Sequence, residues 1–308
     1  MAPGVHSHVT SAEYHRLPAV NSGLVRCMVE RCPAAARFES WLNPERPPDE
    51  KSDAMSAGTI AHALLLEGDN SRVVVIDPFK YPAKSTGAIP TGWTNAAIRA
   101  ARDDAYAAGK LPILANAWAE VEAMVVAARA YLDGLVQSEP EIHAAFLPDG
   151  GDSELSITWN DNGVPCRIRP DRISKDRRLI VDYKTSGTAE PNLWGRTQLI
   201  RMGYYESAAF YRRGVRAAFN VEPDYVFLVQ ECDPPYLCSL VGMDPAGVAL
   251  GAAKMDHGLS LWRKCLASDR WPAYPDRVQY VELPAWESAR WEEAQALAAV
   301  DALPDERP

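Results

Sequence analysis

The most constraining feature of this sequence is a short apolar run that leads directly into charged residues. Leu179 to Val181 predict a buried β-strand, and Asp182-Tyr183-Lys184 follow at once. Side chains on a strand alternate between its faces, so Asp182 and Lys184 point to the same side. A second strand-like stretch, Cys166 to Arg169, precedes Asp171, and the polar residues 174–178 separate the two stretches. A hairpin there places Asp171 beside Asp182.

Two carboxylates beside one ammonium are energetically costly unless a divalent cation joins them. Mg²⁺ prefers carboxylate oxygens and keeps several waters, so two or three acids are enough to hold it. Such an ion polarises a phosphate and lowers the pKa of a bound water, which makes a nucleophile at neutral pH. Asp-x-Lys alone is more often an exposed ion pair of little energetic value. Pro170-Asp171 and Glu154 upstream instead favour metal-dependent phosphodiester hydrolysis.

These residues resemble the signature of the PD-(D/E)XK nucleases: Pro170-Asp171, ten intervening residues, and then Asp182-Tyr183-Lys184. The flanking segments are similar to the nuclease domain of the exonuclease VIII (RecE) family and its phage-encoded relatives. They are Glu154–Trp159, Gly163–Ile173 and Val181–Thr185, with Glu13–His15 and Gly58–Glu67 upstream and Ala209–Tyr211, Val226–Val229 and Trp271-Pro272 downstream. The resemblance covers roughly residues 9 to 275.

The resemblance implies a restriction-endonuclease-like α/β core, in which helices flank a central mixed β-sheet and further helices elaborate the N-terminal side. The implied activity is a Mg²⁺-dependent exonuclease, with Mn²⁺ as a substitute ion, that digests linear double-stranded DNA from 5′ ends. It would leave 3′ single strands for a recombination annealing protein and act as a homo-oligomer. Two alternatives stay open: an endonuclease or flap nuclease of the same fold, and a catalytically silent DNA-binding subunit.

The family's Gly-x-x-x-His element matches Gly58 and His62, which lie one helical turn apart. An isolated histidine on a helix is more often a satisfied polar residue, but the resemblance implies that His62 is a metal ligand together with Asp171 and Asp182. Glu154 would be a further acid, binding a second ion or acting through water. Lys184 would position or activate the nucleophile.

The sequence departs from the family pattern on the helix that follows. The family usually has a glutamine four residues before a tyrosine, whereas Ser207 stands four residues before Tyr211 here. A serine makes a shorter hydrogen bond, directly or through water. Tyr204, Tyr205 and Glu206 are close enough on the helix to replace the glutamine in part. Tyr211 is either a DNA contact or a packed aromatic residue of the helix.

The net charge of −9 hides a local basic excess. Residues 160–220 hold twelve Lys and Arg against six Asp and Glu, which makes this segment +6 and the remainder −15. We expect phosphate contacts and salt-dependent binding from this segment. The alternative is a solvated helix face, which we expect for about half of these arginines. The predicted DNA-binding residues are Arg167, Arg169, Arg172, Arg196, Arg201 and Tyr211.

A chain of 308 residues that is 47% hydrophobic can bury a substantial core. No stretch approaches the roughly 20 apolar residues of a membrane span, and the N-terminus lacks the pattern of a signal peptide, so we expect a cytoplasmic protein. The spacing of the six cysteines does not suit zinc or an iron–sulfur cluster, and free thiols are expected. We predict a flexible N-terminus at residues 1–9, a nuclease domain at 10–284 and a C-terminal helix or tail at 285–308. Within that domain, 10–150 are mostly helical and 151–245 form the catalytic core.

Overall fold

The structure is a computed structural model that describes residues 2–7, 9–46, 57–68, 70–83 and 86–301. The chain divides into two compact units, Met1–Pro272 and Ala273–Pro308. The first unit therefore ends before the predicted domain boundary at residue 284, whereas that boundary adjoins the start of the C-terminal helix at Ala285. The prolines and charged residues at 44–51 predict a surface loop, and most of this segment lies outside the described residues.

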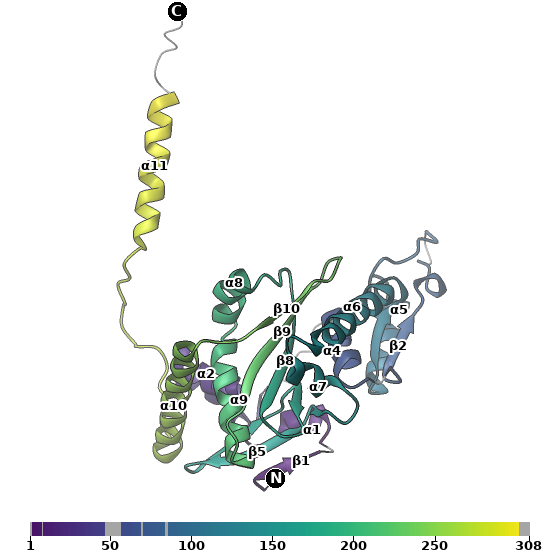
Figure 1. Cartoon of the computed structure of the whole chain (residues 1–308). Coiled ribbons are helices and arrows are strands. Elements are labelled where there is room, and N and C mark those ends of the chain that lie inside the picture. Colours follow the sequence, from purple (N-terminus) through teal and green to yellow (C-terminus); the bar gives the residue numbers. More distant parts are fainter. Residues whose placement is uncertain (1, 8, 47–56, 69, 84–85, 302–308) are drawn as a thin grey trace, which may run out of the picture. The chain divides into compact units, whose positions relative to one another are not determined.

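A five-stranded mixed sheet, in the order β10-β9-β8-β7-β4, forms the centre of the first unit (Figure 1). The strands β8 (Leu179–Ser186) and β9 (Asp224–Glu231) are parallel, and the other pairs are antiparallel. The other three strands are β4 (Gly151–Ser153), β7 (Arg172–Ser174) and β10 (Cys238–Val241). The apolar run of β8 is buried at the centre, as expected for a strand covered on both faces.

Helices cover both faces of this sheet, and each face has its own hydrophobic core (Figure 1). Ile180 and Phe227 pack on one side with α2 (Ser22–Glu30), α9 (Tyr204–Phe219) and α10 (Pro245–Ser268). Val181 and Tyr183 pack on the other side with α4 (Ala57–Leu66), α6 (Ala115–Asp133) and α7 (Pro140–Phe146). The expected restriction-endonuclease-like α/β core is confirmed.

A second, three-stranded sheet packs against α9. Its order is β1-β5-β6, with β1 (Gly4–His6), β5 (Ser156–Asp161) and β6 (Val164–Ile168) all antiparallel. Gly214 of α9 permits this contact, because a Cβ there would lie 2.6 Å from Cδ1 of Ile168. The predicted flexible N-terminus is wrong for residues 4–6, because their backbone pairs with the edge of β5.

The predicted hairpin also differs from the one observed. Asp171 does lie beside β8. The strand that forms the hairpin with β8, however, is the short β7, in which Arg172 lies opposite Val181. The Cys166 to Arg169 stretch belongs instead to β6 of the three-stranded sheet. The chain thus changes sheets at Arg169-Pro170-Asp171, where proline cannot donate a backbone hydrogen bond to either ladder.

The remaining elements lie within residues 11–136. Their helices are α1 (Ser11–Arg16), α3 (Pro33–Glu39) and α5 (Ala96–Ala107), with the 3₁₀ turns η1 (Pro78–Lys80) and η2 (Gly134–Val136). The strands β2 (Val73–Ile76) and β3 (Leu111–Leu114) form a parallel pair.

The residues at about 196–213 predict one helix after β8, but the segment is not a continuous helix. It consists of α8 (Pro191–Trp194), a π-helical turn η3 (Gly195–Leu199) and a break at Gly203, whose φ is +66°. A Cβ on Gly203 would lie 2.6 Å from Nε of Arg26 and from Oε2 of Glu206. Glycine is therefore required at this break for two reasons, its backbone conformation and its neighbours.

The second unit contains α11 (Ala285–Asp301), whose Trp286 and Trp291 are exposed. In the described part of the chain, no helix is both long and apolar enough to cross a membrane. All six cysteines are free thiols, as predicted.

Candidate active site

The strand β8 presents Asp182 and Lys184 on one face, as its alternation predicted. Nζ of Lys184 lies 2.7 Å from Oδ2 of Asp182 and 3.7 Å from Oδ2 of Asp171. Asp182 is only 6% exposed, because the strand is central in the sheet. Its register partner Phe227 and the aromatic ring of Tyr204 close this side of the strand, with Nζ of Lys184 5.4 Å from the Tyr204 centroid.

Asp171 immediately precedes β7, and two contacts hold its carboxylate in place. Its Oδ2 accepts a hydrogen bond of 2.9 Å from the backbone N–H of Tyr183. The same oxygen lies 3.0 Å from Nε2 of His62. The short β7–β8 hairpin therefore brings the Pro-Asp and Asp-x-Lys motifs together although they are separate in the sequence.

The helix α4 carries His62 to the carboxylates. It crosses close to β8 because residue 58 is glycine: a Cβ there would lie 2.3 Å from Oγ1 of Thr185. The imidazole of His62 also lies against the ring of Tyr183, with 6.0 Å between centroids. Because residue 58 has no side chain, α4 can approach β8 closely, and His62, one turn later, reaches Asp171.

Glu154 lies between β4 and β5 and has a φ of +54°, which is uncommon for a residue with a side chain. Its backbone N–H donates to the carbonyl oxygen of Asp171 over 3.2 Å. Its Oε2 accepts a hydrogen bond of 2.5 Å from Nε of Arg169. A sparsely populated backbone conformation, fixed by these contacts, directs this carboxylate toward Asp171.

Ligand atoms of His62, Glu154 and Asp171 lie within 4.8 Å of one another. In octahedral coordination at about 2.1 Å, adjacent ligand atoms are about 3.0 Å apart, and the His62–Asp171 separation matches this. One imidazole and two carboxylates are a donor set that Mg²⁺ and Mn²⁺ accept. Asp182 is not within this group; its Oδ2 lies 2.7 Å from Nζ of Lys184.

Burial and neighbouring charges shift the pKa values of these groups. Burial and the adjacent Asp171 charge raise the pKa of Asp182 above its ordinary value. Burial alone would raise the pKa of Asp171, but the Lys184 charge and the His62 hydrogen bond lower it. Burial would lower the pKa of Lys184, but Asp182 and Asp171 raise it above its usual range. Lys184 is therefore protonated at neutral pH.

Besides Arg169, which binds Glu154, two of the predicted DNA-binding arginines have structural partners. Arg167 is only 3% exposed, and its Nη1 donates to the backbone carbonyls of Tyr14 and Leu17 over 2.6 Å each. The prediction that Arg167 binds DNA does not fit this burial. Nε of Arg172 donates to the carbonyl of Ala145 over 2.7 Å.

Arg172 also links two helices to the sheet. Its Nη1 donates to Oγ of Ser153 over 3.0 Å, and that hydroxyl donates to the carbonyl of Leu66 at the end of α4. Arg172 thus helps to fix the helix that carries His62. These protein contacts account for the position of Arg172, so no contact with a DNA phosphate is needed to explain it.

The other predicted DNA contacts lie on the segment after β8. Arg196 and Arg201 are exposed, and Nη2 of Arg201 donates to Oε1 of Gln198. Tyr211 instead packs against the core and meets the ring of Tyr225 edge-on. Oγ of Ser207 donates to Oγ of Ser22 over 3.1 Å.

The sequence patterns assigned no role to two further residues near the site, Tyr14 and Gln230. Tyr14 lies between two arginines, with Cζ of Arg167 4.9 Å and Cζ of Arg169 5.7 Å from its centroid. The hydroxyl of Tyr183 donates to the buried Gln230, which in turn donates to the carbonyl of Met124. A polar residue within the apolar run of β9 was the available signal for Gln230.

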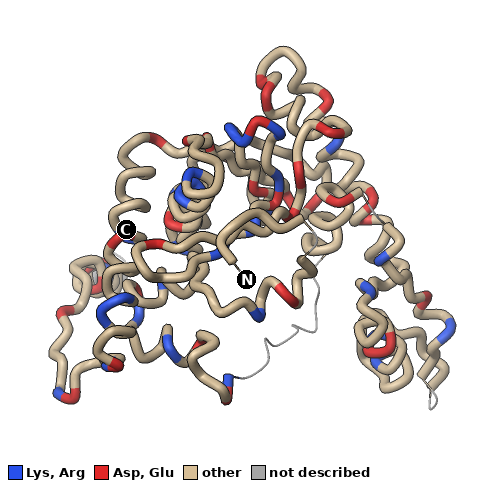
Figure 2. Tube along the Cα trace, turned by 90° about the horizontal axis from the view of Figure 1, so that it is seen from below, with Lys and Arg blue, Asp and Glu red and all other residues tan. Residues whose placement is uncertain are grey.

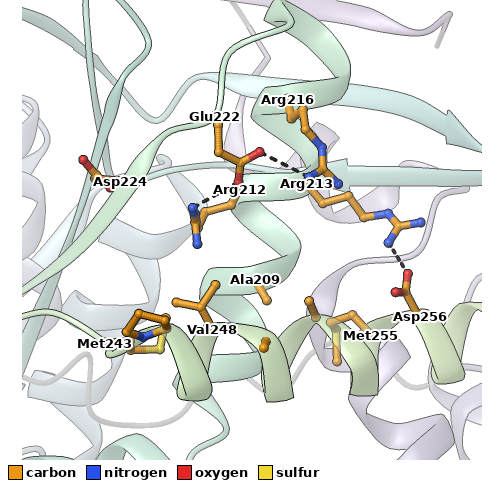
Figure 3. Close-up of a pocket in the computed structure, with 13 residues that line it drawn as sticks. Ala209, Arg212, Arg213, Arg216, Glu222, Asp224, Met243, Val248, Met255 and Asp256 are labelled. Atoms are coloured by element: carbon orange, nitrogen blue, oxygen red, sulfur yellow. Dashed lines mark hydrogen bonds and ion pairs between the residues drawn. The ribbon is translucent and has the colours of Figure 1, made fainter.

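A cavity of about 620 Å³ lies away from this site, between α9 and α10. It is lined by Arg212, Arg213 and Arg216, and Figure 3 shows Glu222 and Asp256 bound to them. Each arginine is thus paired with an acid. Figure 2 likewise shows acidic residues interspersed with basic ones along the chain.

The fold and the Asp-x-Lys site together define a member of the PD-(D/E)XK nuclease superfamily. Residues 27–284 match the family described as PDDEXK-like domain of unknown function (DUF3799), and the chain belongs to this family. The predicted resemblance to PD-(D/E)XK nucleases is thereby confirmed. No curated protein matches the sequence significantly.

Among solved structures, the chain is similar to a protein from Eubacterium rectale that is provisionally described as an exonuclease. The TM-score is 0.55 at 12% identity, over 91% of this chain and 96% of that chain. At this identity the likeness shows the fold alone. The structure of SSO0001 matches 71% of this chain and 97% of that chain at 13% identity, but its TM-score of 0.25 carries no argument.

Proposed function

We propose that this protein is a divalent-metal-dependent deoxyribonuclease that acts as a 5′-to-3′ exonuclease on linear double-stranded DNA. The observation that carries the proposal is the convergence of His62, Glu154 and Asp171 beside the Lys184–Asp182 pair. Family membership supports a nuclease. The exonuclease mode, its polarity, Mg²⁺ as the ion, a homo-oligomeric state and supply of 3′ single strands to an annealing protein follow from the sequence resemblance.

His62, Glu154 and Asp171 would hold the ion. When bound, the ion polarises the phosphate and lowers the pKa of a water molecule. Protonated Lys184 orients the attacking water and offsets negative charge that develops on the phosphate. Asp182 fixes the position of Lys184 through their contact of 2.7 Å.

In this reaction the water oxygen forms a bond to phosphorus and gives up a proton to solvent, while the bond from phosphorus to the 3′ oxygen breaks. The leaving 3′ oxygen takes a proton from solvent, because Lys184 keeps its own proton beside two carboxylates. The products are a 5′ phosphate and a 3′ hydroxyl.

The test is incubation of the protein with 5′-phosphorylated linear duplexes and covalently closed circles, with and without Mg²⁺. We expect mononucleotides from the linear duplex in Mg²⁺, an intact circle, and no products with EDTA. Asp182→Ala should remain folded and lose this activity. Cleavage of the circle would indicate an endonuclease, and DNA binding without hydrolysis in Mg²⁺ or Mn²⁺ would indicate a silent subunit.

A further inference from the structure

Arg169 is built into the metal site. Its Nε is 2.5 Å from Oε2 of Glu154, so one oxygen of this carboxylate already has a cationic partner. The other oxygen is the one left for an ion. Arg169 was predicted from the sequence to contact DNA, but its side chain is only 14% exposed.

The N-terminal segment holds Arg169 in this place. Its Nη1 donates to the carbonyl oxygen of Val9 over 3.0 Å, and its guanidinium lies against the ring of Tyr14. Tyr14 is itself 6% exposed, and Arg167 is bonded to the carbonyl oxygen of the same residue. Arg169 cannot leave Glu154 without breaking contacts that fix α1 on the sheet.

The charges of the site show what this cation does. Three carboxylates (Glu154, Asp171 and Asp182) lie around two cations, Arg169 and Lys184. Each divalent ion that enters the site adds two positive charges beside these cations. Repulsion between cations a few ångströms apart is strong in a partly buried site.

We propose that Arg169 is a fixed cation in the place that a second metal ion would need, so that the site takes one divalent ion. This inference rests on the proposed metal-dependent function. It makes Arg169 a positioning residue: it holds Glu154 with one oxygen toward the ion and limits the number of ions.

The test is a titration of the DNA-free protein with Mn²⁺, which gives the stoichiometry and affinity of binding. The electron paramagnetic resonance signal of free Mn²⁺ measures how much of the ion is unbound. We expect one Mn²⁺ per chain in the wild-type protein. Arg169→Gln removes the fixed charge and should bind its first Mn²⁺ at least about tenfold more tightly. Arg169→Lys keeps the charge and should retain one ion with affinity within about threefold of the wild type.

Arg216→Gln is the matched control. It removes the same charge from an exposed pair with Glu222 and should bind Mn²⁺ like the wild type. Thermal unfolding shows that each variant is folded; if Arg169→Gln does not fold, the wild-type stoichiometry decides. Two ions of similar affinity in the wild type would overturn the inference, as would Arg169→Gln behaving like Arg216→Gln. No binding of Mn²⁺ to any variant would instead overturn the proposed metal site.

Discussion

The active site and the α9–α10 cavity are both clusters of acids and bases, but their charges are arranged differently. In the cavity, Arg213 pairs with Asp161 and Asp256, and Glu222 pairs with Arg212 and Arg216. In the active site, three carboxylates lie around only two cations, beside a histidine. Charges that serve the fold neutralise one another, whereas charges that bind an ion remain incompletely paired.

This difference explains why the α9–α10 cavity is not the candidate active site. Its walls offer paired ions and apolar side chains such as Met243, Val248 and Met255 (Figure 3). The active site offers the second carboxylate oxygen of Glu154, an imidazole nitrogen of His62 and the partly buried ammonium of Lys184. Substitutions in the two regions should therefore have opposite profiles: loss of activity at one and loss of stability at the other.

The largest expected effect is that of Asp171→Asn. It removes a ligand and the partner of His62, so Mg²⁺-dependent DNA cleavage should fall at least about 1,000-fold. Release of nucleotides from an end-labelled linear duplex measures this. Arg213→Gln, in the cavity, should stay within about threefold of wild-type cleavage, since it contacts no group of the site. Similar losses in both variants would abolish the distinction between the two regions.

Lys184→Met should lower the cleavage rate about 100-fold to 1,000-fold, because the phosphate loses its cationic partner. The same change removes a positive charge beside the carboxylates, so Mn²⁺ should bind more tightly. Activity and Mn²⁺ affinity thus move in opposite directions. A joint loss of both would mean that Lys184 only maintains the structure of the site.

Gly58→Ala should weaken Mn²⁺ binding about tenfold, because the new Cβ meets Oγ1 of Thr185 and displaces α4 with His62. Titration with Mn²⁺ measures the change. Combining it with Thr185→Ala removes the nearest atom of the clash and should restore part of the affinity. Equal affinities for Gly58→Ala and the wild type would show that the helix does not set the position of His62.

The smallest effects belong to the cavity. Arg213→Gln leaves Asp161, which is only 6% exposed, without its guanidinium partner, and should lower the free energy of unfolding by about 2 kcal/mol. Arg216→Gln breaks an exposed pair and should change it by no more than about 0.5 kcal/mol. Urea unfolding of both variants measures these values. A larger loss of unfolding free energy in Arg216→Gln than in Arg213→Gln would contradict the account that the buried pair matters more than the exposed one.

The sequence predicted the central strand, the Asp-x-Lys geometry and the fold, because alternation along β8 and short-range motifs carry that information. The sequence could not predict which arginines are covered by the rest of the protein and which are exposed. Arg167 and Arg169 look like surface cations in a basic segment, yet Tyr14, more than 150 residues earlier in the chain, buries both. Tertiary contact, not local composition, decides which charges face DNA.

The same limit applies to the grouping of the acids. The resemblance implied Asp182 as a ligand with His62 and Asp171, and that assignment stays a prediction. The observed distances group Glu154 with His62 and Asp171, whereas Asp182 contacts Lys184. The helix break at Gly203 was not predicted from the sequence either. At this break, Arg26 of the distant helix α2 donates to the carbonyls of Arg201 and Met202. These partners were not visible from local sequence.

The most direct test of the central claim is a crystal structure of the protein with Mn²⁺, located by its anomalous scattering. We predict a single anomalous peak among Nε2 of His62 and the carboxylates of Glu154 and Asp171, with no peak in the arginine-lined cavity. An empty position between these three residues, at a Mn²⁺ concentration that supports DNA cleavage, would contradict the account.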